Sequence, residues 1–121
     1  MRLIALCLTL VATSASAQEG MRESDQRLSK TQLAELLTGQ VLEFYSNSFA
    51  TYYPDGRYEY QYEPGGERVP GTYELMDDST VCTVFQNQFE RCDFLVLAGD
   101  RLVMIIENGE RYPVRDTLAI E

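Results

Sequence analysis

The chain of 121 residues carries 19 acidic and only 10 basic side chains, which gives a formal net charge of −9 at pH 7. It has no cluster of Lys and Arg, so the phosphates of a nucleic acid or of an anionic membrane would meet no basic face. It also has no histidine, which excludes Ser-His and Cys-His nucleophiles and removes the commonest general base and transition-metal ligand. The composition therefore predicts no nucleic-acid partner, no cofactor and no metal site.

The first 17 residues have the pattern of a secretory signal peptide. Arg2 supplies a short basic region, residues 3–11 form an apolar run, and Ala-Ser-Ala at residues 15–17 is a small-x-small cleavage site. The apolar run is much shorter than the roughly 20 residues that cross a bilayer as a helix, so no membrane span is predicted. We expect cleavage near Ala17, loss of Cys7 with the peptide, and a mature protein in the periplasm or secreted from the cell.

A flexible segment and a short helix are predicted after the cleavage site. Residues 18–28 are polar and lack periodicity, so we expect them to be flexible. Ser29 is a suitable N-cap with Gln32 three residues later, and leucines then recur at helical spacing until Gly39. About two turns of helix are too few to be stable alone, so the leucine face must pack against the rest of the domain.

From residue 40 onward, short runs rich in Val, Ile, Tyr, Phe and Thr alternate with turn residues. Asp-Gly at 55–56 and Asn-Gly at 108–109 are strong hairpin signals, and Gly-Asp at 99–100 suits another two-residue turn. No connection is long enough for a helical crossover, which favours antiparallel neighbours. The predicted fold is all-β: residues 29–121 form one domain, an eight-stranded antiparallel meander closed into an up-and-down, lipocalin-like barrel behind one short helix. The expected strands are residues 40–46, 48–54, 57–63, 68–75, 80–86, 91–98, 101–107 and 110–116.

The predicted turns also indicate which side chains share a face. A two-residue turn at 55–56 places one aromatic stripe on a single face, formed by Phe49, Tyr53, Tyr58, Tyr60 and Tyr62. These rings either fill the barrel or line a site for a small apolar or aromatic ligand. Two-residue turns at 99–100 and 108–109 predict a core made of Phe94, Val96, Val103, Ile105, Tyr112 and Val114. The opposite face of these strands is apolar too, so we expect the leucine helix to cover it, with a homodimer contact as the alternative.

Two cysteines, Cys82 and Cys92, remain after the expected cleavage. An oxidising compartment favours a disulfide between them, and a hairpin turn near Asn87 would place them directly opposite each other. Their spacing differs from the CxxC pattern of redox catalysts, so we expect a structural crosslink. By the chain-entropy argument it contributes about 3 kcal/mol.

The acidic residues give no catalytic pattern. Glu59 and Glu63 share a strand face, but four residues of strand separate them by about 13 Å, which is too far for an acid/base pair. Asp77 and Asp78 lack the ligand spacing of a calcium loop and fit a turn better. We therefore expect no enzyme activity, and a carboxylate-dependent hydrolase is the least favoured interpretation.

Several of these motifs occur together in one family. The combined pattern is a leucine helix with its glycine (33–39), Tyr-Tyr-Pro-Asp-Gly (52–56), Gly-Thr-Tyr (71–73), Val-Cys (81–82), Cys92 and Gly-Asp-Arg (99–101). It resembles an uncharacterised proteobacterial family of small secreted domains of unknown function over most of residues 33–107. That family usually has Gly-x-Trp where this chain has Gly-Thr-Tyr, so a smaller ring would fill that place. The resemblance implies a lipocalin-like or similar β-barrel and no activity.

Two functions from different classes follow from the sequence. The leading hypothesis is a non-catalytic envelope protein that binds a small ligand or a protein partner such as another envelope protein. The alternative is an inhibitor of a secreted protease that uses residues 18–28 as its insertion arm. Some secreted bacterial protease inhibitors are similar small eight-stranded barrels with one disulfide, which is a likeness of fold alone.

Overall fold

The computed structural model describes residues 20–121. The expected signal peptide, its cleavage site and Cys7 lie outside the described residues. Within residues 20–121, no helix has the length and apolar character that crossing a membrane requires.

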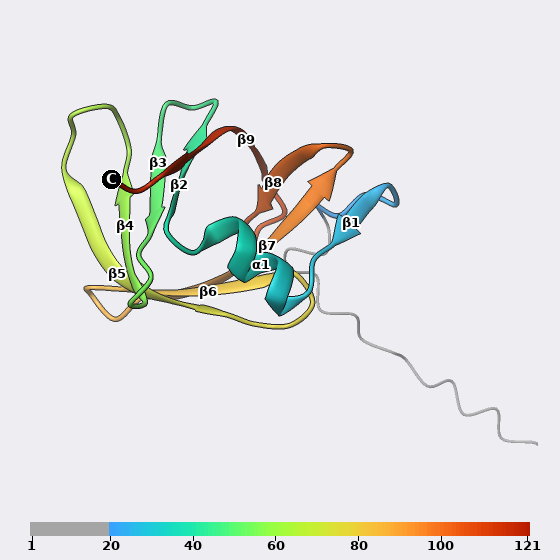
Figure 1. Cartoon of the computed structure of the whole chain (residues 1–121), viewed down its shortest axis with the longest axis horizontal. Coiled ribbons are helices and arrows are strands. Elements are labelled where there is room, and N and C mark those ends of the chain that lie inside the picture. Colours follow the sequence, from blue (N-terminus) through green and yellow to red (C-terminus); the bar gives the residue numbers. More distant parts are fainter. Residues whose placement is uncertain (1–19) are drawn as a thin grey trace, which may run out of the picture.

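Eight antiparallel strands, β2 to β9, close into a barrel in the described part of the chain, because β2 pairs with β9 as well as with β3 (Figure 1). A short additional strand, β1, pairs with the end of β7 beyond the reach of β6. Each predicted strand overlaps one of these eight, so the expected fold class is confirmed. The elements are β1 (Asp25–Arg27), α1 (Lys30–Leu37), β2 (Gln40–Phe44), β3 (Phe49–Tyr52), β4 (Arg57–Gln61), β5 (Arg68–Leu75), β6 (Thr80–Phe85), β7 (Glu90–Ala98), β8 (Arg101–Ile105) and β9 (Arg111–Ala119).

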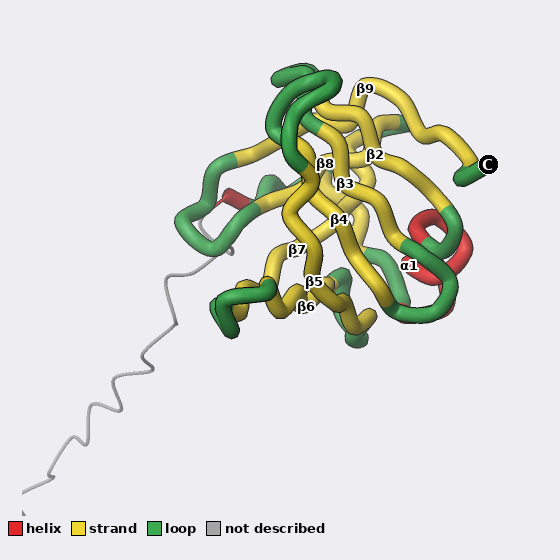
Figure 2. The backbone as a smooth tube through the Cα atoms, turned by 90° about the vertical axis from the view of Figure 1, so that its left-hand side faces the viewer, coloured by secondary structure: helices red, strands yellow, loops and turns green. Residues whose placement is uncertain are grey.

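The helix α1 begins with the predicted capping box. Ser29 Oγ accepts a hydrogen bond from the backbone N–H of Gln32 at 3.2 Å, and the Gln32 side chain accepts one from the Ser29 N–H at 2.9 Å. Leu33 and Leu37 are both fully buried and belong to the main core cluster. The backbone N–H of Gly39 then donates to the Tyr52 carbonyl at 2.8 Å, which holds the helix against the end of β3. Figure 2 shows α1 at the ends of β2, β3 and β4.

Four hairpins of the described chain use the same three-residue loop. In each, the residue before the loop donates its N–H to the residue after it, as Tyr53 does to the Arg57 carbonyl at 2.9 Å. The third loop residue has left-handed backbone and donates back to the residue before the loop. This geometry is a type I turn followed by a bulge, and it replaces the two-residue turns predicted at 55–56 and 108–109. The left-handed residues are Asn47 (φ 62°), Gly56 (φ 93°), Gln88 (φ 69°) and Gly109 (φ 88°).

One extra loop residue shifts the pairing of β3 with β4 by one position. Tyr58 lies opposite Tyr52 and Tyr60 opposite Ala50, whereas Tyr53 and Phe49 were expected to face the tyrosines of β4. Because side chains alternate across a strand, Tyr58 and Tyr60 point into the barrel while Phe49 and Tyr53 lie outside. The predicted single aromatic stripe is therefore wrong.

The same shift affects the last hairpin. The turn at 99–100 is as predicted, with Val96 opposite Val103. At the next turn, however, Tyr112 lies opposite Met104 where Ile105 was expected. The barrel interior contains the alternate set of side chains, with Leu95, Leu102 and Met104 in the main core. Of the predicted core, Val114 belongs to this cluster and Tyr112 packs against it, but the other four side chains lie outside: Phe94, Val96, Val103 and Ile105.

The N-terminal segment, not α1, covers this outer apolar cluster. Met21 packs against Val96, Val103 and Ile105. A Cβ atom at Gly20 would overlap the Gly109 carbonyl oxygen and lie 2.6 Å from Ile105 Cγ2, so the backbone at residue 20 lies directly on the cluster. The helix α1 packs instead in one cluster with Leu95, Leu102 and Met104, on the face that the sequence predicts it to cover, but that face is the barrel interior and not the outer surface.

The described part of segment 18–28 is also more structured than expected. Asp25 forms a two-hydrogen-bond ion pair with Arg111, at 2.6 and 3.0 Å. Leu28 is 2 % exposed, and its carbonyl oxygen accepts a hydrogen bond from the Ser79 N–H at 2.7 Å. The polar composition of the segment concealed these contacts, since one buried carboxylate and one buried leucine are enough to attach it.

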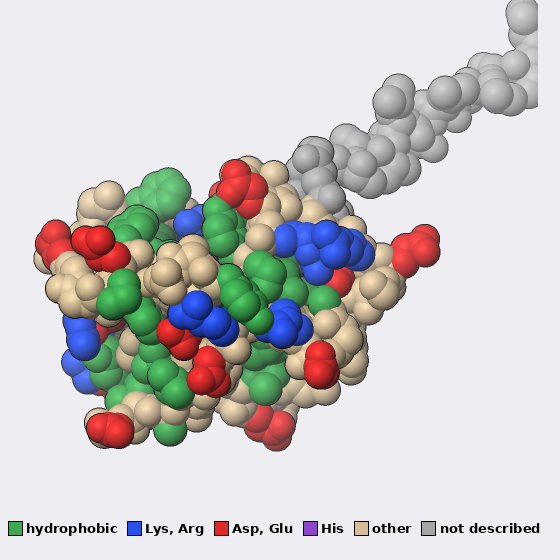
Figure 3. All heavy atoms as spheres, turned by 90° about the horizontal axis from the view of Figure 1, so that it is seen from above, with side chains coloured by type: hydrophobic (Ala, Val, Ile, Leu, Met, Phe, Trp, Pro, Cys, Tyr) green, Lys and Arg blue, Asp and Glu red, His purple; other side chains and the backbone are tan. Residues whose placement is uncertain are grey.

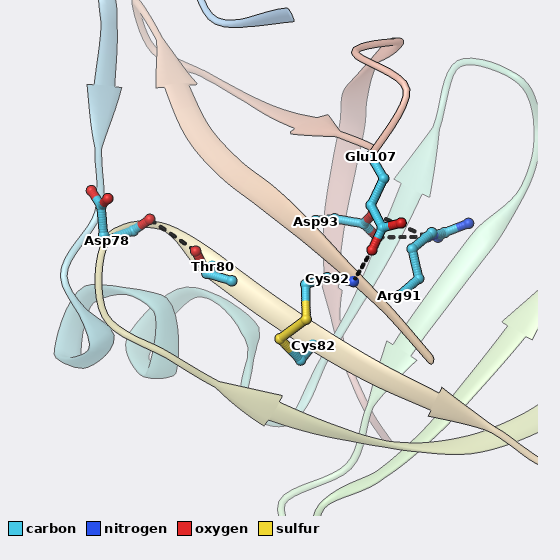
Figure 4. Close-up of a disulfide and its surroundings, with 7 residues drawn as sticks. All are labelled: Asp78, Thr80, Cys82, Arg91, Cys92, Asp93 and Glu107. Atoms are coloured by element: carbon cyan, nitrogen blue, oxygen red, sulfur yellow. Dashed lines mark hydrogen bonds and ion pairs between the residues drawn. A yellow bond between two sulfur atoms is a disulfide. The ribbon is translucent and has the colours of Figure 1, made fainter. Parts of the chain in front are cut away.

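Cys82 and Cys92 form the predicted disulfide. They are direct partners in the pairing of β6 with β7, with 4.0 Å between their Cα atoms. Their side chains share the outer face with Phe94, as the pairing predicts. The disulfide thus connects two neighbouring strands from outside the barrel (Figure 4).

The β6–β7 loop allows a test of the recurring turn. Gln88 occupies the left-handed position that glycine occupies in two of the other loops. We expect Gln88→Gly to raise the free energy of unfolding by about 0.5–1 kcal/mol, because glycine adopts this conformation without a Cβ clash. Urea denaturation measures the change. Gln86→Gly in the same loop is the matched control and should be destabilising; equal effects at both positions would contradict the assignment.

Candidate functional site

A pocket of about 190 Å³ opens at one end of the barrel. Its lining residues include Phe44 at the end of β2, Phe85 at the end of β6 and Tyr112 near the start of β9. In an antiparallel barrel, these positions meet at one end. The helix α1 lies at the other end, next to the start of β2 and the end of β3. The interior is therefore closed by leucines at one end and open at the other.

The pocket is lined mainly by aromatic and apolar side chains. Tyr58 and Phe85 are in edge contact with 5.9 Å between ring centres, and Tyr60 and Tyr62 meet in the same way at 4.8 Å. Burial raises the pKa of the Tyr58 phenol, so it is neutral at physiological pH. The full lining is Phe44, Ser48, Ala50, Tyr58, Tyr60, Tyr62, Phe85, Arg91, Met104, Ile106 and Tyr112.

The structure divides the predicted binding residues between two places. Tyr58, Tyr60 and Tyr62 line the pocket. Phe49 and Tyr53 instead line a groove on the outer surface, to which Tyr60 also contributes. There the Tyr53 hydroxyl donates to Glu59 at 3.1 Å. The five aromatic residues therefore do not form one site.

Two charged residues of the interior were missed by the sequence analysis. Arg91 and Asp93 lie two positions apart on β7 and share the inward face with Leu95. The Arg91 Nε atom and the Asp93 carboxylate are 3.0 Å apart, and the Arg91 guanidinium lies 5.8 Å from the centre of the Phe85 ring. Figure 4 shows the two side chains pointing toward each other, beside Glu107. Choosing the odd-numbered residues of β7 as the inner face would have revealed the pair.

The carboxylate of Asp93 is in an unfavourable environment. The residue is 3 % exposed, and its Oδ1 atom, although 3.0 Å from Arg91 Nε, accepts no hydrogen bond from the described residues. Burial raises the pKa of Asp93 to about 6, although Arg91 acts to lower it. Glu107 adds a smaller raising effect, and the buried phenols of Tyr52 and Tyr58 face the same region. Asp93 is therefore ionised at neutral pH in surroundings that disfavour its negative charge.

The hydrophobic side chains on the face shown in Figure 3 are interspersed with basic and acidic ones. Among residues 20–121, no three His, Cys, Asp or Glu side chains come together as a group that could hold a metal ion. The aromatic pocket combines a mainly apolar lining with one guanidinium, which is typical of a small-molecule site.

No protein family, curated protein or solved structure matches this chain. The resemblance based on the turn motifs and cysteines thus remains a prediction. The fold itself places the protein among closed antiparallel β-barrels with one disulfide and an interior that opens at one end.

Proposed function

We propose that this protein is a non-catalytic binding protein that holds a small, mainly apolar or aromatic ligand in the open end of its barrel. The observation that carries the proposal is the aromatic pocket at the end of the barrel opposite α1. Its volume of about 190 Å³ is below the usual range of roughly 300–1,000 Å³ for ligand pockets. The ligand is therefore small, or it extends beyond the mouth of the barrel.

The expected location supports this role. The Cys82–Cys92 disulfide is compatible with an oxidising compartment, and the N-terminal pattern predicts export to the periplasm or secretion.

The structure favours ligand binding over the inhibitor hypothesis. An insertion arm has to reach into the protease, yet within residues 20–28 the side chains of Asp25 and Leu28 are buried against the barrel. The contacts of this segment thus support a role in stability. We therefore do not propose inhibition as a second function.

A neutral dye tests the proposal. N-phenylnaphthylamine fluoresces more strongly in apolar surroundings and should bind the protein with a single saturable site. Tyr60→Ala removes a ring from the pocket wall and should weaken binding about tenfold, because an aromatic contact is worth on the order of 1 kcal/mol or more. Fluorescence titration measures both affinities.

The matched control is Tyr53→Ala. It removes the same ring from the outer side of the same hairpin, so dye binding should stay unchanged. Circular dichroism shows whether each variant remains folded. Failure of the dye to bind the unmodified protein, or equal losses in the two variants, would refute the proposed function.

A further inference from the structure

Arg91 is the one charged side chain among the residues that line the pocket. Its Nε–H is directed to Asp93, and within residues 20–121 its side chain makes no other hydrogen bond. A guanidinium has five N–H donors, and Asp93 accepts from one of them. The side chain is 29 % exposed, compared with 4 % for that of Asp93, which places the arginine at the boundary between pocket and buried carboxylate.

Asp93 is poorly suited to remain the permanent partner of Arg91. Oδ1 lies 3.0 Å from Arg91 Nε but accepts no hydrogen bond, because that N–H is directed at Oδ2, and burying an ionised carboxylate is costly unless it is paired and fully hydrogen-bonded. Its charged neighbour besides Arg91 is Glu107, which repels it, and the nearby phenols of Tyr52 and Tyr58 are neutral. Protonation would remove this buried charge, provided that another anion neutralises Arg91.

We propose that the ligand is a monoanion with an apolar body, that its anionic group replaces Asp93 as the partner of Arg91, and that Asp93 takes up a proton. This inference rests on the proposed function and specifies the ligand class for the same pocket. The site holds one positive and one negative charge before binding, and the same after it, because the proton that Asp93 gains from water offsets the charge of the ligand. A dianion would leave one buried negative charge uncompensated.

Two small probes of nearly equal shape test the anionic group. Phenylacetate carries a carboxylate, and phenylacetamide is its neutral counterpart. At pH 6, phenylacetate should displace N-phenylnaphthylamine at least about tenfold more effectively than phenylacetamide, because hydrogen bonds to charged groups are the stronger ones. Equal displacement by the two probes would overturn the inference while leaving the proposed function intact.

The pH dependence tests the proton. Free Asp93 is ionised above about pH 6, so binding of phenylacetate has to take up one proton in that range. The affinity for phenylacetate should therefore fall by up to about tenfold per pH unit above pH 6, whereas that for phenylacetamide should stay constant. Calorimetry in two buffers with different ionisation enthalpies counts the proton directly. Tight binding of phenylacetate without proton uptake would overturn the exchange.

Two variants separate this mechanism from a merely structural ion pair. Asp93→Asn removes the competing carboxylate, so phenylacetate should bind more tightly at pH 8 and without proton uptake. The double variant Arg91→Gln/Asp93→Asn leaves no buried charge at these positions, so it should stay folded by circular dichroism and bind phenylacetate and phenylacetamide equally. A preference that persists in the double variant would also overturn the inference.

Discussion

Replacing Asp25 with asparagine is expected to lower the free energy of unfolding by roughly 3 kcal/mol, because the change breaks a buried ion pair and leaves one charge without its partner. The side chains of Asp25 and Arg111 are 0 % and 14 % exposed. An asparagine amide would direct N–H donors at the Arg111 guanidinium or at the Arg22 N–H, both of which are donors themselves. Urea denaturation at neutral pH measures the loss.

An exposed ion pair of the same chemistry provides the control. Asp55 and Arg57 are 2.7 Å apart, but their side chains are 57 % and 64 % exposed, so Asp55→Asn should leave the free energy of unfolding nearly unchanged. The hydrogen bond from Arg111 lowers the pKa of Asp25 below its ordinary value of 3.8. The stability that this pair contributes is therefore complete above pH 3.8 and is lost as the pH falls further. Similar losses from Asp25→Asn and Asp55→Asn would show that the N-terminal segment is not held by its ion pair.

The fold class could be predicted because it depends on features that are local in sequence. Period-two runs and turn residues define the strands, and short connections force antiparallel pairing. The capping box of Ser29 and Gln32 and the pairing of Cys82 with Cys92 also follow from nearby residues. None of these required knowledge of which face is inside.

The registers could be predicted only where the turn type was unambiguous. Asp-Gly and Asn-Gly suit a two-residue turn, but they also suit the last two positions of a three-residue loop, where only glycine needs left-handed backbone. The structure uses the second option at Gly56 and Gly109. When the pairing of two strands shifts by one residue, every side chain of one strand lies on the opposite face of the sheet from the residue it was expected to face. This is why Phe49 and Tyr53 were wrongly assigned to the same site as Tyr58.

In β7 and β8 both faces are apolar, so alternation gave no criterion for the inside of the barrel. The predicted core contains even-numbered residues of β7, which places Arg91 and Asp93 outside. Polarity favours that choice, because charged side chains are rarely buried. The barrel nevertheless encloses the pair, and a buried carboxyl with a raised pKa beside a pocket is a candidate functional group.

The second large effect is expected at Asp93. Burial raises the pKa of this carboxyl from 3.8 to about 6, so between these values the folded state binds a proton more tightly than the unfolded state does. Stability therefore decreases as the pH rises through this window, by about 1.4 kcal/mol per unit or roughly 3 kcal/mol in all. Asp93→Asn cannot ionise, so its stability relative to the unmodified protein should increase by about that amount between pH 4 and pH 7. Denaturation at a series of pH values measures the difference.

Asp25→Asn is the comparison variant, because its effect on the free energy of unfolding should have the opposite sign. That substitution should destabilise the protein throughout the neutral range, because the pKa of Asp25 is lowered and its charged form is favoured by folding. Asp93→Asn should do the opposite, since folding disfavours the charged form of Asp93. A neutral-pH loss at position 93 as large as that at position 25 would mean that Arg91 holds the carboxylate firmly, and the exchange of partners on ligand binding would lose its driving force. A gain would show that the unmodified barrel retains a destabilising charge next to its pocket, where an incoming anion can relieve it.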